Sequence, residues 1–393
     1  MFIKQKISLT TIGAALITLG TVGQATAASF YSINDLGTLP SSSFSYATDI
    51  NNLGQVVGYS GNEYNSSHAF FWENGVITNI GTLGGSGSLG WGINNSSQVV
   101  GGAQTRDVTY DGFPISHAFL WSKSVGITDL TQSGNLTTSA EKINDAGQVI
   151  GSTENGNAFL LENGVTTDLC QLGQSCSAYG INNSGQVVGE RQVVVGTKCF
   201  EDYYGRYCND ITANQAYLWK NGKITNLGTI GNAQNSSSAF AINDVGQIVG
   251  EADFRAVLWE NGKITDLGTL GGRGRSALDI NNLGEIVGRA ATHGYYEDLH
   301  AFLWDRTNGI QDLNSLIPTK SGWLLSEARG INSAGQIVGS GIINGQQHAF
   351  LLTPKPIPES ASGLGLLAFG AIGAGYQLLR KQILASGTTN TRS

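Results

Sequence analysis

A nine-residue pattern, Ile-Asn-x-x-Gly-Gln-Val-Val-Gly with small variations, recurs along the chain. Its seven copies begin at Ile50, Ile93, Ile143, Ile181, Ile242, Ile280 and Ile331. The shortest step between neighbouring copies is 38 residues, and the longest is 61, from Ile181 to Ile242. A period in this range is typical of propeller blades and of helical arrays. Short runs of Val, Ile, Thr, Phe and Trp broken by Gly and Asn favour β-strands, so the helical arrays are excluded.

Each copy belongs to a larger unit that predicts four strands, which we call a to d. Strand a precedes the Ile-Asn pair, as at 276–280, and strand b is the end of the nonapeptide. A motif such as "HAFLW" at 300–304 is strand c, and a segment such as "ITDLGTL" at 264–270 is strand d. The a–b connection has one length in all copies, and its Asn and Gly suit a tight hairpin, in which Asn bonds its own backbone.

The two ends of the repeat region complement each other. The first segment, "YSINDLGTL" at 31–39, is a strand d with no unit before it, and the last unit ends after "HAFLL" at 348–352 without a strand d. If the first strand completes the last sheet, the repeats close into a ring without open edges, which a linear array cannot do. We therefore predict an all-β fold, a seven-bladed β-propeller of four-stranded blades, over residues 28–353.

The N-terminus is typical of export. Lys4 and Lys6 precede an apolar stretch, and small residues follow it up to a cleavage site after Ala27. This arrangement predicts a secretory signal peptide at residues 1–27.

The C-terminus is typical of membrane attachment. A Pro-rich linker at 354–360 leads into an uncharged stretch that ends in Arg380 and Lys381. Residues 361–381 are thus predicted to be a transmembrane or sorting helix with a basic end, followed by a short tail at 382–393. The alternative is a further strand or helix of the globular domain.

The repeat signature, from "HAFLW" through "ITDLGTLGG" to "IN..GQVVG", resembles the HAF-repeat family of bacterial extracellular proteins over residues 31–352. This resemblance carries no catalytic residues or known ligand. The C-terminus resembles the PEP-CTERM sorting signal, a Pro-Glu-Pro motif followed by an apolar helix and a basic end. Here the motif reads "IPES", with Ser360 in place of the second Pro. The resemblance implies a cell-surface, extracellular or membrane-anchored protein and an exosortase-like sorting protease as a partner.

Function is predicted at the b–c connections, because they vary in length whereas the a–b turns do not. The long ones, at 102–116, 190–214 and 289–299, are rich in aromatic residues. Exposed aromatic rings suit both sugar faces and protein partners, so we expect an extracellular polysaccharide or a surface protein as ligand. The alternative is that these rings only pack within their own loops. The candidate ligand-binding residues are Tyr110, Phe113, Tyr203, Tyr204, Tyr207, Tyr295 and Tyr296.

Four cysteines in an exported chain predict disulfides. Three connectivities are possible, and the two local pairs, Cys170 with Cys176 and Cys199 with Cys208, are favoured. A metal site is the alternative, but it lacks partnering histidines. Four histidines recur at the first position of strand c in different blades, which indicates a structural role: His68, His117, His300 and His348. We expect no metal and no cofactor.

Composition and motifs favour a binding module over an enzyme. Only 13% of the residues are charged and the formal net charge is −7, so no nucleic-acid partner is expected. The strand-a segments show no obvious acidic cluster for the channel, and no catalytic residues are predicted. The alternative is an exported glycan hydrolase or lyase. Its candidate carboxylates are Glu201 with Asp202, or Glu297 with Asp298, although adjacent acids on a loop are usually solvated.

Overall fold

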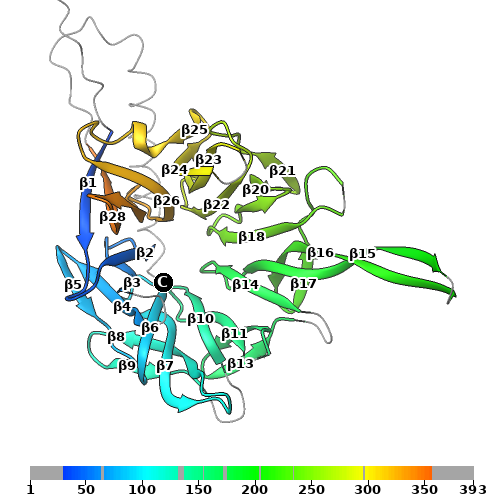
Figure 1. Ribbon diagram of the computed structural model, residues 1–393, viewed down its shortest axis with the longest axis horizontal. Helices are drawn as coiled ribbons and strands as arrows, with labels where there is room; N and C mark the ends of the chain where they lie inside the picture. Colours follow the sequence, from blue (N-terminus) through cyan, green and yellow to red (C-terminus); the bar gives the residue numbers. More distant parts are fainter. Residues whose placement is uncertain are drawn as a thin grey trace, which may run out of the picture.

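The computed structural model describes residues 30–355 except 63–65, 132–136, 154, 171–174, 203–204, 233 and 295–296. Seven antiparallel sheets of four strands each form blades around a central channel (Figure 1). This arrangement confirms the predicted seven-bladed β-propeller. The predicted signal peptide and the predicted helix at 361–381 lie outside the described residues. Within the described part of the chain, no helix is long and apolar enough to cross a membrane.

Strands a to d of each blade run from the channel outward, in sequence order except in the last blade. Blades 1 to 3 are formed by β2 (Phe44–Ile50), β3 (Val56–Gly61), β4 (His68–Glu73) and β5 (Val76–Asn79); β6 (Gly84–Ile93), β7 (Val99–Val108), β8 (Pro114–Ser122) and β9 (Gly126–Asp129); and β10 (Thr137–Ile143), β11 (Val149–Thr153), β12 (Ala158–Glu162) and β13 (Val165–Asp168).

The remaining blades follow the same plan, and the short 3-10 helix η2 (Leu313–Ser315) precedes the last one. Blades 4 to 7 are formed by β14 (Cys176–Ile181), β15 (Val187–Asp202), β16 (Gly205–Lys220) and β17 (Lys223–Asn226); β18 (Ser237–Ile242), β19 (Ile248–Ala252), β20 (Arg255–Glu260) and β21 (Lys263–Asp266); β22 (Arg275–Ile280), β23 (Ile286–His293), β24 (Glu297–Asp305) and β25 (Gly309–Asp312); and β26 (Trp323–Ile331), β27 (Ile337–Ile343), β28 (Gln346–Pro354) and β1 (Tyr31–Gly37).

The ring is closed by the first strand, as predicted. β1 pairs antiparallel with β28, in a register from Tyr31 opposite Pro354 to Gly37 opposite Ala349. All the named strands lie between Tyr31 and Pro354, and so do the hydrophobic cores. This segment therefore contains the complete propeller.

The hydrophobic cores lie between neighbouring blades. Val57 and Phe71 of blade 1, for example, share a cluster with Phe119 and Trp121 of blade 2. The last Gly of each nonapeptide is required by the close approach of strands a and b within each blade. A Cβ on Gly58 would lie 1.9 Å from the carbonyl oxygen of Tyr46 on strand a, and the same clash, at 1.8–2.0 Å, recurs in every blade. The repeat thus keeps Gly where two strands approach closely.

The long b–c connections are hairpins, which corrects the prediction of loops. The ladder between β15 and β16 continues to the pair Asp202–Gly205, and β7 with β8 and β23 with β24 are extended in the same way. Continued pairing satisfies backbone hydrogen bonds that an open loop would leave to water. The β15–β16 hairpin reaches well beyond the ring (Figure 1).

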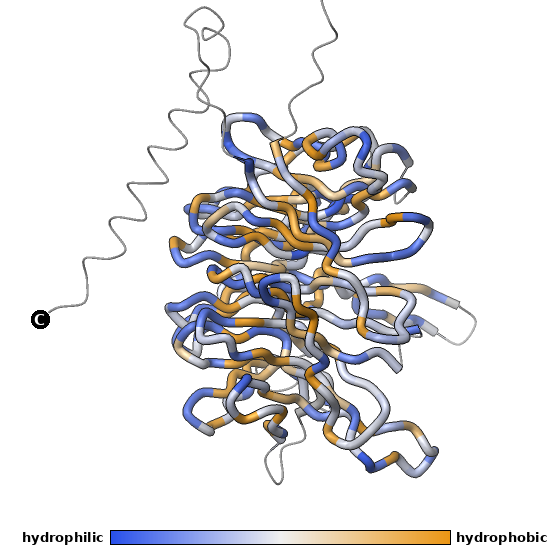
Figure 2. The backbone as a smooth tube through the Cα atoms, turned by 90° about the vertical axis from the view of Figure 1, so that its left-hand side faces the viewer, coloured by the Kyte–Doolittle hydropathy of each residue, from blue (hydrophilic) through white to orange (hydrophobic). Residues whose placement is uncertain are grey.

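The disc has two different faces. In a four-stranded meander, the a–b and c–d turns lie on one face, which we call the turn face. The b–c hairpins lie on the other, which we call the hairpin face. Figure 2 shows the disc from the side, with the longer hairpins extending from one face.

Candidate functional site

The central channel is lined by strand a of every blade, and each of these strands carries a β-bulge at one repeat position. On β2 the register shifts between Ala47 and Asp49, and equivalent shifts occur in the other six. A bulge adds a residue and re-aims its side chain. We call the two residues before each repeat Ile the channel positions: Thr48-Asp49, Trp91-Gly92, Glu141-Lys142, Tyr179-Gly180, Phe240-Ala241, Leu278-Asp279 and Arg329-Gly330.

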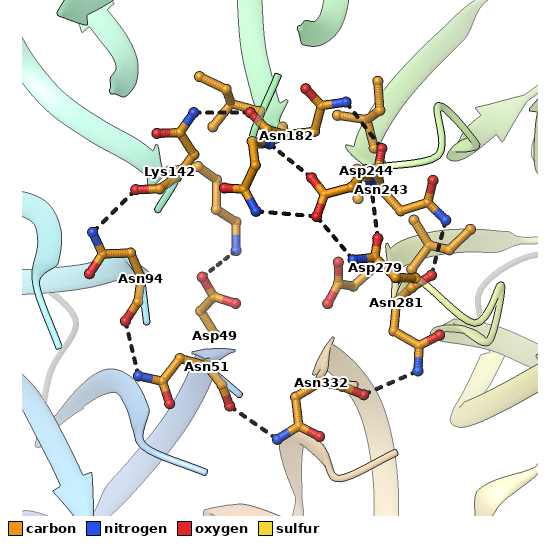
Figure 3. Close-up of a pocket in the computed structure, with 18 of the residues that line it drawn as sticks. Asp49, Asn51, Asn94, Lys142, Asn182, Asn243, Asp244, Asp279, Asn281 and Asn332 are labelled. Carbon is orange, nitrogen blue, oxygen red and sulfur yellow. Dashed lines mark hydrogen bonds and ion pairs between the residues drawn. The ribbon is translucent and has the colours of Figure 1, made fainter. Parts of the chain in front are cut away.

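At the turn face, the Asn of each repeat joins its blade to the next. Its Nδ2 donates a hydrogen bond of 2.9–3.1 Å to the carbonyl oxygen of the equivalent Asn, and the last of the seven bonds, from Asn332 to Asn51, closes the circle (Figure 3). Asn51 also accepts the N–H groups of Leu53 and Gln55 at 3.0 Å, the local role that the sequence predicted. We call the seven residues the asparagine ring: Asn51, Asn94, Asn144, Asn182, Asn243, Asn281 and Asn332.

The residues after the asparagine ring form a second series of hydrogen bonds from blade to blade. The N–H of Asn95 donates to Asp145 Oδ1 at 2.9 Å, and the N–H of Asn183 donates to Asp244 Oδ1 at 2.9 Å. Asn183 Nδ2 lies 3.2 Å from both of these carboxylates. The polar groups at the turn face are therefore largely engaged with one another, which indicates that their main role is to hold the blades together.

Three charged side chains lie in the channel beside the asparagine ring, where they line a cavity of about 190 Å³. Lys142 of blade 3 reaches across to Asp49 of blade 1, with 2.9 Å between Nζ and Oδ2, and Asp279 enters from blade 6 (Figure 3). All three are second channel positions. In the other four blades the second channel position is Gly or Ala, which leaves room for the long Lys142 side chain.

Asp279 changes charge near neutral pH. Burial, opposed only in part by Lys142, raises the pKa of Asp279 to about 7, and the nearby Asp49 adds to the rise. The N–H of Ile331 donates to Asp279 Oδ2 at 2.8 Å and favours the charged form. The cluster therefore combines one ion pair, Lys142 with Asp49, with one carboxyl group, Asp279, that gains or loses its proton near pH 7.

On the hairpin side of this cluster, the channel carries aromatic rings around a carboxyl group. Going around the ring of blades, Glu141 lies between Trp91 and Tyr179 at equivalent channel positions. All three are partly exposed, and since strand a is the innermost strand this exposure is to the channel. The ring centroids of Trp91 and Tyr59 are 5.8 Å apart, and those of Tyr179 and Phe240 are 5.6 Å apart.

Further polar groups follow on blades 4 to 7. Glu190 accepts hydrogen bonds from Tyr179 at 3.2 Å and from Ser238, and Glu251 accepts one from Ser276 at 2.6 Å. Glu327 is held by two arginines: Arg289 Nη1 lies 3.5 Å and Arg329 Nε 3.1 Å from its carboxylate oxygens.

Burial also affects two of the channel carboxyl groups. It raises the pKa of both Glu141 and Glu251. The hydrogen bond from Ser139 and the charge of Lys142 act in the opposite direction on Glu141, and the hydrogen bond from Ser276 and the charge of Arg289 do so on Glu251. In the described part of the chain, no Lys or Arg lies within ion-pair distance of either group. The hairpin end of the channel thus has a negative character beside its aromatic rings.

The predicted ligand-binding residues lie at hairpin tips on the hairpin face. Tyr110 and Phe113, at the end of β7–β8, are fully and 67% exposed. Tyr207 is 48% exposed and stacks on Phe200 across the β15–β16 hairpin, with centroids 5.4 Å apart. Tyr203, Tyr204, Tyr295 and Tyr296 lie outside the described residues. The exposed residues come from two different blades, and the β15–β16 tip lies well beyond the ring (Figure 1), so they do not form one cluster.

The cysteines and histidines lie at structural positions. Disulfides join Cys170 with Cys176, in the core between blades 3 and 4, and Cys199 with Cys208, near the tip of the β15–β16 hairpin. Three of the strand-c histidines contact an Asp of strand d in their own blade at 2.6–2.9 Å, as the pairs His117–Asp129, His300–Asp312 and His348–Asp35. Within the described ranges, no group of three or more metal-ligating side chains is present.

Of the acids considered for hydrolysis, Glu201 and Asp298 lie on the hairpins of different blades. Glu201 pairs across the ladder with Arg206 and is exposed, and Asp298 is 71% exposed with His293 Nε2 3.5 Å from its carboxylate. The channel itself carries acidic side chains that the sequence showed no obvious sign of, because Asp49, Glu141 and Asp279 lie on strand a of blades 1, 3 and 6. Aligning the seven repeats reveals the two channel positions. Their residues vary, whereas the small residue before them, Ala or Gly, and the Ile after them are kept in every repeat.

Comparison with known proteins identifies the fold only. No family model matches the chain, and neither does any curated protein. The β-propeller domain of the Trilobed protease from Pyrococcus furiosus, described as having an open velcro topology, is similar at a TM-score of 0.50 and 12% identity, covering 79% of this chain and 94% of that one. This chain differs in having its last blade closed by β1.

Two further solved structures are similar at lower scores. YCF48 bound to D1 peptide has a TM-score of 0.48 and 11% identity, with 83% of this chain and 97% of that chain covered. The GH74 xyloglucanase from Xanthomonas campestris has a TM-score of 0.42 and 12% identity, with 80% and 44% covered. The architecture alone does not decide between an enzyme and a binding protein.

Proposed function

We propose that the chain is an exported, surface-associated binding module that holds an extracellular polysaccharide through its hairpin face. The observation that carries this proposal is the set of exposed aromatic side chains at hairpin tips, Tyr110, Phe113, Phe200 and Tyr207. Aromatic rings stack on the apolar faces of sugars, while hydroxyl and carboxylate groups bond sugar hydroxyls. Both kinds of group occur on this face.

A polysaccharide suits the layout better than a folded protein partner. The four exposed rings lie on two separate hairpins, β7–β8 and β15–β16, whereas protein interfaces concentrate their aromatic anchors in one packed centre. An extended chain can contact several such points and gains affinity from each. The net charge of −7 favours a neutral or basic polymer over an acidic one.

Export rests on separate observations. The signal-peptide pattern, the HAF-repeat resemblance and the PEP-CTERM-like end each predict a protein outside the cytoplasm. The two disulfides agree with this location, because such bonds persist in oxidising compartments. The sorting protease and the membrane helix belong to the same proposal.

A glycan-array screen of the 28–354 fragment tests the proposal. We expect binding to neutral or basic polysaccharides, weakened at least tenfold when Tyr110, Phe113, Phe200 and Tyr207 are all changed to Ala. The matched control changes Leu53 and Val245, which are 64% and 69% exposed on the turn face, to Ala and should bind normally.

Three outcomes would contradict the proposal. In the first, the fragment binds no glycan and captures a surface protein instead. In the second, the Leu53 and Val245 control loses as much glycan binding as the aromatic variant does. In the third, the fragment converts a bound glycan to products. The last would favour the hydrolase alternative.

A further inference from the structure

The channel residues near the hairpin face differ from blade to blade. Every repeat keeps the residues that build the blade, whereas the first of the two channel positions is occupied by a different residue type in each blade: Thr48, Trp91, Glu141, Tyr179, Phe240, Leu278 and Arg329. If packing alone selected these residues, equivalent positions would carry similar side chains. The position three residues before Ile does so, with a buried Ala in six blades and Gly90 in blade 2. Their diversity therefore indicates a role other than building the ring.

Trp91, Glu141 and Tyr179 give this part of the channel its chemistry. They come from three consecutive blades, so the carboxyl group has an aromatic residue on each side. The neighbouring aromatic contacts, of Tyr59 with Trp91 and of Phe240 with Tyr179, continue the aromatic wall in both directions. Aromatic faces and a carboxylate both attract a cation, and a partly desolvated site strengthens that attraction.

The charges around the site select the sign of the ligand. The channel's two arginines, Arg289 and Arg329, are already engaged by Glu327. Lys142, in turn, is engaged by Asp49. Glu141 makes no ion pair among the described residues. Burial raises its pKa, and the Ser139 hydrogen bond and the Lys142 charge offset this only in part, so the protein alone stabilises the charged carboxylate poorly. A cationic group placed beside Glu141 would supply the missing stabilisation.

We propose that Trp91, Glu141 and Tyr179 form a subsite for a sugar unit that carries a protonated amine. The aromatic rings stack on the sugar, and the Glu141 carboxylate receives the ammonium group. This inference rests on the proposed polysaccharide function and adds to it a preference for amine-bearing polymers, with the hairpin tips supplying affinity along the chain.

The test compares three oligosaccharides of equal length with the 28–354 fragment. They are a glucosamine hexamer, its N-acetylated form and a glucose hexamer, measured by calorimetry at pH 6, where the amine is largely protonated. We expect the glucosamine hexamer to bind at least tenfold more tightly than the other two. Glu141→Gln should remove this preference while leaving the weaker binding of the neutral hexamers in place, and Trp91→Ala should weaken all three.

Two controls separate this subsite from general attraction of a polycation to an acidic protein. Asp253→Asn removes one negative charge from an exposed turn on the same face, at a left-handed φ of 50° that Asn tolerates, and it should keep the preference. Thermal melting of Glu141→Gln should match or exceed that of the parent, because the variant removes a buried charge.

The outcomes distinguish the two proposals. Equal binding of all three hexamers, or a preference that survives Glu141→Gln, overturns the subsite and leaves the polysaccharide function standing. Binding of none of them, together with a failed array screen, overturns both. Glu141-dependent binding of a lysine-rich peptide without any sugar binding would show that the ligand class is wrong.

Discussion

The two ends of the channel are built from the same seven strands and differ in almost everything else. At the turn face, Asn occupies the same position in every blade, and its amide bonds pass from blade to blade around a full circle. At the hairpin end, only a few residues along the same strands, the side chains differ from blade to blade. The repeated residues thus close the ring, and the residues that break the repeat remain available for recognition.

The first prediction removes the closure itself and has the largest expected effect. A chain that begins at Pro40 lacks β1, exposes the edge of β28 and loses Leu36 and Leu39, which are 4% and 5% exposed. We expect it to unfold or to oligomerise, because an open strand edge pairs with other chains. Size-exclusion chromatography and thermal melting measure both results, with a chain that begins at Phe30 as the control. A stable monomer from Pro40 would show that the closing strand is dispensable.

The second prediction breaks the asparagine ring at one member. Asn182 is 3% exposed, donates to Gln186 and Asn243, and accepts two N–H groups of its own turn. Because Asn182→Ala leaves several of these buried groups without partners, we expect it to lower the free energy of unfolding by about 3–5 kcal/mol. Denaturant unfolding measures the change.

The β15–β16 hairpin gives the contrast for that measurement. Changing both Cys199 and Cys208 to Ser removes a covalent bond from an element outside the ring, where local unfolding need not involve the blades. We expect the global unfolding free energy to change by less than about 1 kcal/mol, while proteolysis of the hairpin becomes faster. A larger global loss than that of Asn182→Ala would reverse the contrast between the two faces.

The third prediction concerns pH and the charged cluster between the two ends. The folded-state pKa of Asp279 is about 7 and its unfolded value is about 3.9, so its contribution to stability is fully present below about pH 4. That contribution is lost as the pH rises through about 7. Asp279→Asn should therefore leave stability at pH 4 unchanged and increase it at pH 8, by up to about 4 kcal/mol. Asp298→Asn at an exposed site is the control, and a parallel pH profile for Asp279→Asn and the parent would contradict the assignment.

The sequence predicts the ring better than the site, for a physical reason. Strands, turns and closure follow from features repeated in every unit, such as the Asn-Gly turns and the unmatched strand at 31–39, so each copy supports the others. The site lies where no repetition exists. Trp91 and Glu141 are ordinary strand residues in the sequence, and only the bulge and the ring geometry bring them beside each other. The sequence did not predict the extended hairpins, because their β-ladders continue past the Gly that ends each nonapeptide into segments that differ between the copies.

The smallest expected effect tests how strictly the turn face needs its repeat. Blade 2 has Ser97 where the other six turns have Gly, and Ser97 adopts a left-handed φ of 60°. That conformation costs a non-glycine residue about 1 kcal/mol, and the Ser97 hydroxyl offsets part of the cost by donating to Gln55 Oε1 at 2.8 Å. We expect Ser97→Gly to change the unfolding free energy by less than about 0.5 kcal/mol, since strain and hydrogen bond are lost together. Ser97→Ala loses only the bond and should be less stable than Ser97→Gly by about 1 kcal/mol. Equal stability of the two variants in denaturant unfolding would mean that the turn accepts any small residue, and that Gly recurs in the repeat for some reason other than its backbone conformation.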